Sequence, residues 1–462
     1  MSPRSTGHER EGEIVNDNGA ASLRAAARAV HLPGDDGYDR ARSIWSLAAD
    51  LRPAAVVFPE SVDEISAVVR AAGRAGLRVT PVGTGHNAHP LRDLSRTVML
   101  RTSRLDGVTV DAPNRRARVQ AGTTWSPVVE QAAGHGYAAL HGSAPDVSVA
   151  GYTAGGGLSW YGRKYGLAAN HVTAAELVLA DGTQVRVDAD HEPDLFWAVR
   201  GGGGNFGVVT ALEFSLLDFA TAYAGFLAWD LDKAPQVLRR WLEWTAEAPD
   251  EVTTAYRHMR FPPIPELPEP FRGRDWVMID GAVQAGDERA EQLLAPLREL
   301  KPEIDTFARV PSPVVSRIHM DPEEPTPGDG TTGLLDALPP EAAGKLLEAD
   351  ATNRLFSTEL RHLGGALARP AAGGGALSAL DGQYLFAVVG VVFSPEVRAA
   401  VVAEADRMVG SLAEYSRDRI YTNFQQTQGD TSRAFAPAVW QRLLELRHRV
   451  DPHQTLQANH EI

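Results

Sequence analysis

The stretch PVGTGHNAHP, residues 81–90, places His86 directly after two closely spaced glycines in a tight loop. Residues 61–76, SVDEISAVVRAAGRAG, begin with a capping box and predict an amphipathic helix, and LRVTPVG at 77–83 predicts a strand that leads into the loop. Glycine permits positive φ angles and lets a ligand approach the backbone closely. The pattern also suits an ordinary turn, so the loop alone does not decide between a ligand site and a simple connection.

The composition is that of an ordinary globular protein, with 44% hydrophobic and 23% charged residues among 462. This length predicts two substantial domains. A net charge of −14 disfavours nucleic acid and an anionic membrane as partners, since both attract basic surfaces. The absence of cysteine excludes disulfides, thiolate metal sites and cysteine nucleophiles, and favours a cytoplasmic location.

The first twenty residues are polar and lack the apolar core of a signal peptide, so we expect a disordered tail there. No apolar run approaches the ~20 residues that a membrane span requires.

Four segments are expected along the chain. Residues 1–37 form a tail and lead-in, and residues 38–217 mix helices and strands with glycine loops at the joints. Residues 218–415 contain longer helices that alternate with strands, and residues 416–462 form a final segment. The pattern predicts an α+β fold rather than a single parallel sheet.

Three glycine loops, Gly83–His86, Gly155–Gly157 and Gly201–Gly204, lie within one part of the chain. Two stretches, 83–88 and 202–207, match a dinucleotide fingerprint, but neither has the strand–loop–helix context that the Rossmann mechanism needs. Walker A, HExxH and GxSxG motifs are absent. The density of glycine loops favours an extended, phosphate-bearing ligand held by backbone amides.

The order of these motifs resembles the FAD-binding fold of the vanillyl-alcohol-oxidase/PCMH superfamily, and most of all the berberine-bridge-enzyme-like oxidases. The resemblance runs from about residue 40 to the end. The stretches that carry it are AAVVFPESVDEISAVVRAAGRAGLRVTPVGTGHN, VQAGTTWSPVVEQAAGHG, GSAPDVSVAGYTAGGGLSWYGRKYGL, ELVLADGTQVRV, DLFWAVRGGGGNFGVVT, IYTNFQQ and DPHQTLQANHEI.

The resemblance implies a PCMH-type FAD-binding domain of two α/β subdomains at 38–217. It also implies a substrate-binding domain at 218–415, with an antiparallel sheet covered by helices, and a final segment at 416–462 that returns to the FAD domain. His86 matches the family histidine that bonds to the 8α-methyl of FAD, and a neutral imidazole is a suitable nucleophile.

Four positions, compared with the family pattern, bear on the attachment of the flavin and on the mechanism. Ala144 stands where many relatives have a second, cysteine attachment, so a single linkage through His86 is expected. Val147 matches a position where Val accompanies oxygen access, which favours an oxidase. Tyr152 replaces a frequent histidine near the flavin N1–C2 edge, where its hydroxyl could stabilise reduced flavin. Phe424 stands where sugar and alcohol oxidases often have a tyrosine base, and it cannot accept a proton.

Candidates for the missing base lie on the strands expected to cover the flavin. They are Tyr256, His258, Glu359, Arg361 and Tyr384, and Tyr256 and Glu359 are the first choices for this role. In an extended strand, Tyr256 and His258 share one face, and Glu359 and Arg361 share one face.

Further site residues are assigned from the resemblance. The predicted catalytic set is Tyr256, Glu359, Tyr152, Tyr421 and Asn423. The predicted FAD contacts are Val82, Gly83, Thr84, Gly85, His86, Asn87, Val147, Ala150, Gly151, Tyr152, Gly155, Gly156, Gly157, Gly204, Gly207, Val208, Tyr421 and Asn423. No metal site is predicted.

The resemblance implies an oxidase that transfers hydride from a small secondary-metabolite-type alcohol or amine to flavin N5, with O2 as electron acceptor and H2O2 as product. A flavin-dependent oxygenase or cyclase acting on a polyketide-like intermediate is the first alternative. A binding module that has lost catalysis and an NAD-dependent enzyme are weaker alternatives. The sequence does not indicate which oligomeric state the protein adopts.

Overall fold

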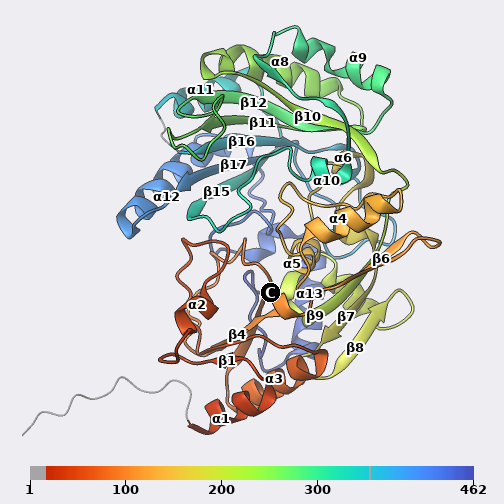
Figure 1. Cartoon of the computed structure of the whole chain (residues 1–462), viewed down its shortest axis with the longest axis vertical. Coiled ribbons are helices and arrows are strands. Elements are labelled where there is room, and N and C mark those ends of the chain that lie inside the picture. Colours follow the sequence, from red (N-terminus) through yellow and green to blue (C-terminus); the bar gives the residue numbers. More distant parts are fainter. Residues whose placement is uncertain (1–16, 353–354) are drawn as a thin grey trace, which may run out of the picture.

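The computed structural model describes residues 17–352 and 355–462. Three sheets form the frame, with the third sheet and its covering helices above the other two (Figure 1). Within the described residues, no helix is long and apolar enough to cross a membrane. The mixed α+β class and the helix-covered antiparallel sheet are confirmed.

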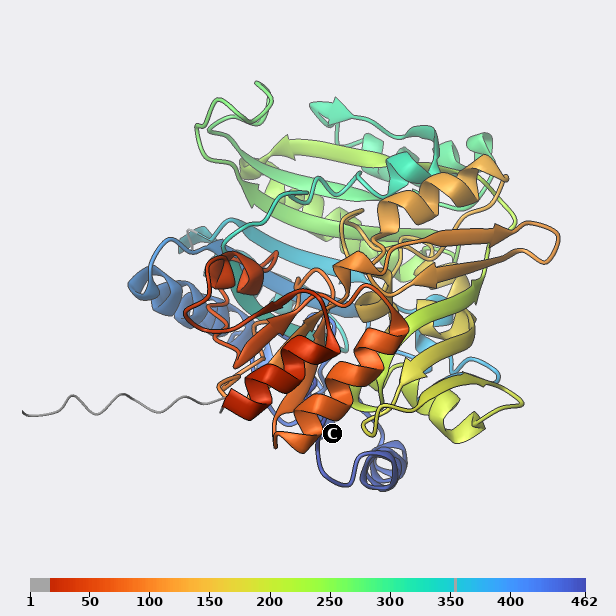
Figure 2. The same cartoon turned by 60° about the horizontal axis from the view of Figure 1, so that its bottom comes forward.

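The first sheet has four strands, and β2, β4 and β3 run parallel while β1 pairs antiparallel with β2. In sheet order they are β1 (Val30–His31), β2 (Ala55–Val57), β4 (Thr97–Arg101) and β3 (Arg78–Val82). The accompanying helices are α1 (Asp17–Ala26), α2 (Tyr38–Arg42) and α3 (Val62–Arg74), and α1 lies beside α3 (Figure 2).

The helix predicted at 61–76 is α3, and its sequence explains its position. Ser61 caps it, because the Ser61 side chain accepts a hydrogen bond from the N–H of Glu64. Ile65, Val68 and Val69 are fully buried on one face. Strand β3 follows, so the His86 loop leaves the carboxyl end of a strand as expected.

The second sheet is antiparallel and has five strands. In order they are β5 (Val108–Asp111), β6 (Arg116–Gln120), β9 (Val208–Ser215), β7 (Val172–Val178) and β8 (Gln184–Asp188). Helices α4 (Trp125–Gly134), α5 (Val149–Ala154), α6 (Gly162–Tyr165) and α7 (Pro193–Val199) connect these strands. The sequence predicts hairpins at residues 107–122 and 174–188, with turns at 112–114 and at Asp181–Gly182, and both hairpins, β5–β6 and β7–β8, are confirmed.

The third sheet has eight strands, all paired antiparallel. In order they are β13 (Ile304–Asp305), β10 (Thr221–Asp230), β12 (Asp275–Val283), β11 (Val252–Arg260), β16 (Ser357–His362), β17 (Tyr384–Val391) and β15 (Gly328–Leu335), with β14 (Ala308–Pro311) also on β10. Helices α8 (Ala234–Glu247), α9 (Asp287–Arg298), α11 (Pro340–Thr352) and α12 (Pro395–Gly410) cover its outer face (Figure 1). The short α10 (Ser312–Val315) lies beside α4.

Several elements differ from the sequence expectation. Residues 17–20, expected in a disordered tail, belong to α1, whose Leu23 is fully buried in the core of the first sheet; residues 1–16 lie outside the described residues. The Pro/Glu-rich composition of residues 321–329 predicts a surface loop, but strand β15 begins within it, because the three glycines of β15 hide the strand pattern. Strand β10 and helix α9 were not predicted.

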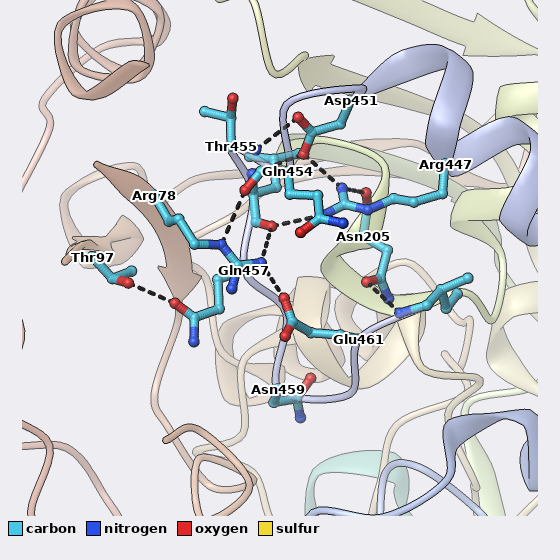
Figure 3. A network of polar contacts seen from close by, with 12 residues as sticks. Arg78, Thr97, Asn205, Arg447, Asp451, Gln454, Thr455, Gln457, Asn459 and Glu461 are labelled. Carbon is cyan, nitrogen blue, oxygen red and sulfur yellow. Dashed lines mark hydrogen bonds and ion pairs between the residues drawn. The ribbon is translucent and has the colours of Figure 1, made fainter. Parts of the chain in front are cut away.

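The C-terminal segment binds the first sheet to the rest of the fold. After α13 (Pro437–Val450), the N–H of Val79 donates to Thr455 O, and Gln457 N–H donates back to Val79 O. Asp451 accepts hydrogen bonds from the N–H groups of Thr455 and Leu456, each at 2.8 Å. Arg447 lies 2.9 Å from Asp451 and also donates to the carbonyl of Asn205 (Figure 3).

We expect Asp451→Asn to lower the free energy of unfolding by about 3 kcal/mol, because it leaves the buried Arg447 guanidinium without its carboxylate. Asp194→Asn is the matched control: Asp194 also pairs with arginines, but on the surface, so its loss costs less than about 1 kcal/mol. Urea unfolding followed by tryptophan fluorescence measures both. Equal effects of the two substitutions would contradict the assigned role of Asp451.

Candidate functional site

A cavity of about 1520 Å³ lies where the glycine loops, the third sheet and the C-terminal segment meet. Its walls include the His86 loop, helix α5 and the Gly201–Gly204 loop. Strands β11, β16 and β17 supply the roof, and residues 458–460 of the C-terminal segment complete the wall. The cavity is large enough to hold a dinucleotide together with a second molecule.

The His86 loop depends on a glycine conformation at its centre. Gly85 has a φ of 88°, and a Cβ there would lie 2.6 Å from Cβ of Ile44. This turn presents His86 to the cavity, where Trp45 stacks on its ring with centroids 4.0 Å apart. Thr84 Oγ1 lies 2.8 Å from Nδ1 of His86. The buried Nε2 has no hydrogen-bond partner and lies 3.4 Å from Oδ2 of Asp146.

The Gly201–Gly204 loop presents its backbone to the cavity. Gly201 and Gly203 have φ angles of 109° and 68°. A Cβ at Gly201 would lie 2.5 Å from the backbone nitrogen of Leu377, so only glycine fits. The N–H groups of Gly201 and Gly202 donate to Ala154 O and Ala198 O, so those of Gly203 and Gly204 are the candidates for holding phosphate without a basic side chain.

The Gly155–Gly157 loop has a different role from the one expected. A Cβ at Gly157 would lie 2.6 Å from the ring of Tyr152, so the glycines make room for neighbouring side chains. Asn423 Nδ2 donates to the carbonyl of Tyr152 at 2.8 Å and contacts the Tyr421 hydroxyl at 3.3 Å. The Tyr152 hydroxyl donates to Leu140 O at 3.0 Å, so its proton is already engaged and burial raises its pKa.

Fourteen of the eighteen expected FAD contacts line the cavity. They are Val82, Gly83, Thr84, Gly85, His86, Asn87, Val147, Ala150, Gly151, Tyr152, Gly155, Gly204, Gly207 and Asn423. Gly156, Gly157, Val208 and Tyr421 lie outside the described lining, and Val209 faces the cavity where Val208 was expected. Alternation along β9 explains this last difference.

The strand faces separate the candidate bases into two groups. Glu359 and Arg361 of β16 line the cavity, as do Arg257 and Met259 of β11. Tyr256 points to the opposite, helix-covered face, so its expected place at the flavin is corrected.

The other two candidates share that helix-covered face with Tyr256. Tyr256 lies 2.5 Å from His258, which contacts Asp350 at 2.6 Å. Tyr384 bonds to the Thr245 hydroxyl at 2.9 Å and belongs to the same core. These groups stabilise the packing of helices on the third sheet.

A buried network of charges covers the cavity. Asp280 of β12 lies 2.7 Å from Arg257 and 2.6 Å from Nδ1 of His319. Nε2 of His319 lies 2.9 Å from Arg361 and 3.5 Å from Glu359. His319, Arg257, Glu359 and Arg361 all line the cavity, whereas Asp280 is fully buried behind them.

The network fixes the protonation of its members. Burial raises the pKa of Glu359, but Arg361 and His319 lower it by more, so Glu359 stays ionised. Burial and Arg257 lower the pKa of His319, whereas Asp280, Asp321 and Glu359 raise it by more, so that it lies above its ordinary value. In neutral His319, Nδ1–H donates to Asp280 and Nε2 accepts from Arg361.

Sequence reasoning missed several residues of this site. His319 and Asp280 come from a loop and from a strand between other strands, and only the tertiary structure brings them together. Arg257 lies between two residues that were considered, so the alternation of β11 offered a signal. Trp45 and Asp146, which contact His86, had no signal in spacing.

The site fits FAD. The Gly201–Gly204 loop on the cavity wall suits a diphosphate, the imidazole of His86 on the same wall suits a flavin partner, and the polar roof suits a substrate. Residues 53–188 match the FAD binding domain family.

The chain is also similar to named proteins. It is 34% identical over 201 residues to (R)-6-hydroxynicotine oxidase of Paenarthrobacter nicotinovorans, covering 43% of this chain and 44% of that protein. It is 28% identical over 303 residues to the FAD-dependent monooxygenase drtC of Aspergillus calidoustus, covering 60% of this chain and 58% of that protein. The chain thus spans about half the length of these curated relatives.

A structure of a berberine bridge enzyme variant superposes with a TM-score of 0.79 at 19% identity, over 96% of this chain and 99% of that one. At this identity the likeness concerns the fold. The FAD binding domain match and the fold of the berberine bridge enzyme agree with the expected resemblance. The relatives' names support the predicted oxidoreductase class.

We expect Gly151→Leu to abolish FAD binding with little loss of stability. Gly151 lines the cavity, and a Cβ there meets no protein atom within 4 Å, so the new side chain occupies ligand space. Gly134→Leu is the matched control, because Gly134 also has open space but lies at the exposed end of α4. Flavin absorbance of the purified variants, with thermal unfolding, measures both effects. Normal flavin content in Gly151→Leu would contradict the placement.

Proposed function

Because the chain carries an FAD binding domain within the fold of the berberine bridge enzyme, we propose that it is an FAD-dependent oxidase with its flavin attached covalently through His86 alone. The imidazole of His86, which lines the cavity wall at the end of β3, carries this proposal. Ala144 also lines the cavity and offers no atom for a second bond.

The glycine loops would hold the cofactor through their backbones, and Asn423 would fix helix α5 against it. FAD, when bound, supplies an acceptor for a hydride from the substrate and delivers its two electrons to O2. The chain's own residues then have to orient the substrate and accept its proton.

We assign the proton acceptor to His319. Its Nδ1 is held by the buried carboxylate of Asp280, and its Nε2 reaches the cavity wall, which is the arrangement of a base oriented by a third group. Arg361 contacts both His319 and the ring of Phe424, with 4.9 Å from the guanidinium carbon to the ring centroid. Arg361 thus connects His319 in space to Phe424, the position where relatives often carry a tyrosine base.

Glu359 has a different role from the base that was expected. Arg361 lies 2.5 Å from its carboxylate and keeps it ionised, which makes it a weak base but a strong hydrogen-bond acceptor. We propose that Glu359 orients the substrate through an O–H or N–H group, so that the neighbouring His319 receives the proton.

The side chains at the mouth of the cavity indicate the chemical character of the rest of the substrate. Ile264, Met320, Phe393 and Val397 are exposed apolar side chains that line it, and Phe393 is 82% exposed. An alcohol or amine with an apolar body suits this site, since its apolar part covers these side chains while its polar end meets the roof. This fits a secondary-metabolite-type substrate better than a free sugar.

A flavin-dependent oxygenase or cyclase remains the second candidate. The similarity to a relative named FAD-dependent monooxygenase favours it, as does the apolar mouth, which suits a polyketide-like intermediate. Release of one H2O2 per substrate oxidised would select the oxidase.

We expect FAD to stay on the polypeptide after acid denaturation, with the added mass on the peptide that contains His86. In His86→Ala, acid releases all flavin. Intact-mass measurement and peptide mapping test this. Flavin released from the wild-type chain, or found on a different peptide, would contradict the single linkage.

We expect the acid limb of kcat/KM to lie above about pH 6.5, the ordinary pKa of histidine, because His319 accepts a proton only when neutral and its pKa is raised. Glu359→Gln and Asp321→Asn each move the limb to lower pH, since each removes a negative charge that raises this pKa. The control Asp190→Asn, at an exposed residue, leaves the acid limb at its wild-type pH. H2O2 formation across the pH range measures the limb.

His319→Asn should remove the limb and lower kcat about 10²- to 10⁴-fold while flavin content is unchanged. An unaltered pH profile in this variant would exclude His319 as the proton acceptor.

A further inference from the structure

Asp146 and His86 are partly exposed side chains whose facing polar atoms are buried and lack hydrogen bonds. Asp146 Oδ2 lies 3.4 Å from Nε2 of His86. Neither carboxylate oxygen of Asp146 has a hydrogen-bond partner, and neither has Nε2. Among the described residues, the cavity wall includes His86 but not Asp146, so the carboxylate lies behind the imidazole.

The backbone holds Asp146 in this place. The N–H of Ser126 donates to Pro145 O at 2.8 Å, and the N–H of Trp125 donates to Val147 O at 3.1 Å. Both residues belong to the first turn of α4, so the loop is fixed on each side of Asp146. A buried carboxylate without partners is costly, and a position enforced in this way calls for a functional reason.

The contacts of Asp146 and Thr84 define the tautomer of His86. A carboxylate accepts hydrogen bonds and does not donate them, so the ring proton lies on Nε2, which faces Asp146 Oδ2 at 3.4 Å. Nδ1 is then an acceptor, and it lies 2.8 Å from the Thr84 hydroxyl, which donates to it. The nitrogen that carries no proton, and that can act as the nucleophile, is therefore Nδ1.

We propose that Asp146 activates His86 for covalent attachment of FAD by taking the Nε2 proton as Nδ1 forms the new bond. The inference rests on the proposed attachment through His86. Attack by a neutral imidazole leaves the ring positively charged, and the adjacent carboxylate stabilises that charge and removes it. Trp45, stacked on the imidazole, keeps the ring in the required plane.

The step balances with O2 as the oxidant. A C–N bond forms between Nδ1 and the 8α carbon. The methyl group loses one hydrogen as a proton, and Nε2 loses its proton to Asp146. The two electrons left over pass to O2, which takes up two protons. One methyl group, one imidazole and one O2 thus give one N-alkylated imidazole and one H2O2.

Attachment can be timed directly on the full chain. Apoprotein produced in a riboflavin-auxotrophic host is mixed with saturating FAD in air, samples are stopped in acid, and covalent flavin is read by in-gel fluorescence. The dissociation constant of FAD before attachment is measured separately by flavin fluorescence. Saturating FAD ensures that weaker binding cannot imitate slower attachment.

We expect Asp146→Asn to slow attachment at least tenfold, as for loss of a general base, while initial FAD affinity changes less than about twofold. Asp146→Glu should keep most of the rate, and added formate should accelerate Asp146→Ala. Neither rescue is expected if Asp146 only supports the fold. Exposed Asp106→Asn serves as the control and should attach at the wild-type rate.

The outcomes separate the two proposals. Attachment of Asp146→Asn at the wild-type rate, or slow Asp146→Ala that formate does not rescue, overturns the role of Asp146 and leaves His86 attachment intact. A wild-type chain that never retains flavin in acid overturns the covalent linkage, and this inference with it.

Discussion

The left-handed turn at Gly85 is the constraint on which the site depends. A side chain at this position would collide with Ile44, so the chain can turn here only as glycine. The turn directs His86 off the end of β3 into the cavity, between the stacking ring of Trp45 and the carboxylate of Asp146. The cofactor's place, and therefore the place of any substrate under the roof, follows from this one backbone conformation.

The C-terminal segment holds in place the strand β3 and the loop in which this turn lies. Its strand-like pairing with Val79 and the buried Arg447–Asp451 pair fix β3 at the edge of the first sheet. Asn459 Nδ2 also donates to the carbonyl of Asn87, one residue beyond His86. Residues of the C-terminal segment thus contact the His86 loop, which follows β3. This explains why a segment so distant in the sequence belongs to the cavity wall.

Much of the flavin half of the site could be predicted from the sequence, because its signals are local. Glycine loops, a capped helix and two hairpins each depend on neighbouring residues, and the expected contacts from Val82 to Asn87 all reached the cavity. The substrate half could not be predicted in the same way. Strand alternation placed Glu359 and Arg361 together but left open which face meets the cavity, so Tyr256 was assigned wrongly.

Long-range contacts account for the rest. Asp280, His319 and Arg361 are separated by about 40 residues at each step, and no periodicity links them. Strand β15 was hidden by its glycines, which are tolerated because β17 and α12 pack on it. Tyr152 illustrates a third cause: its identity was predicted to matter through its hydroxyl, but that hydroxyl donates to Leu140 O.

A crystal structure of the protein purified with its cofactor would test the central claim most directly. We predict continuous density from Nδ1 of His86 to the 8α carbon of FAD, none from Ala144, and the flavin ring below Glu359, Arg361 and His319. A flavin separated from His86 by a van der Waals gap, or lying away from this roof, would contradict the account.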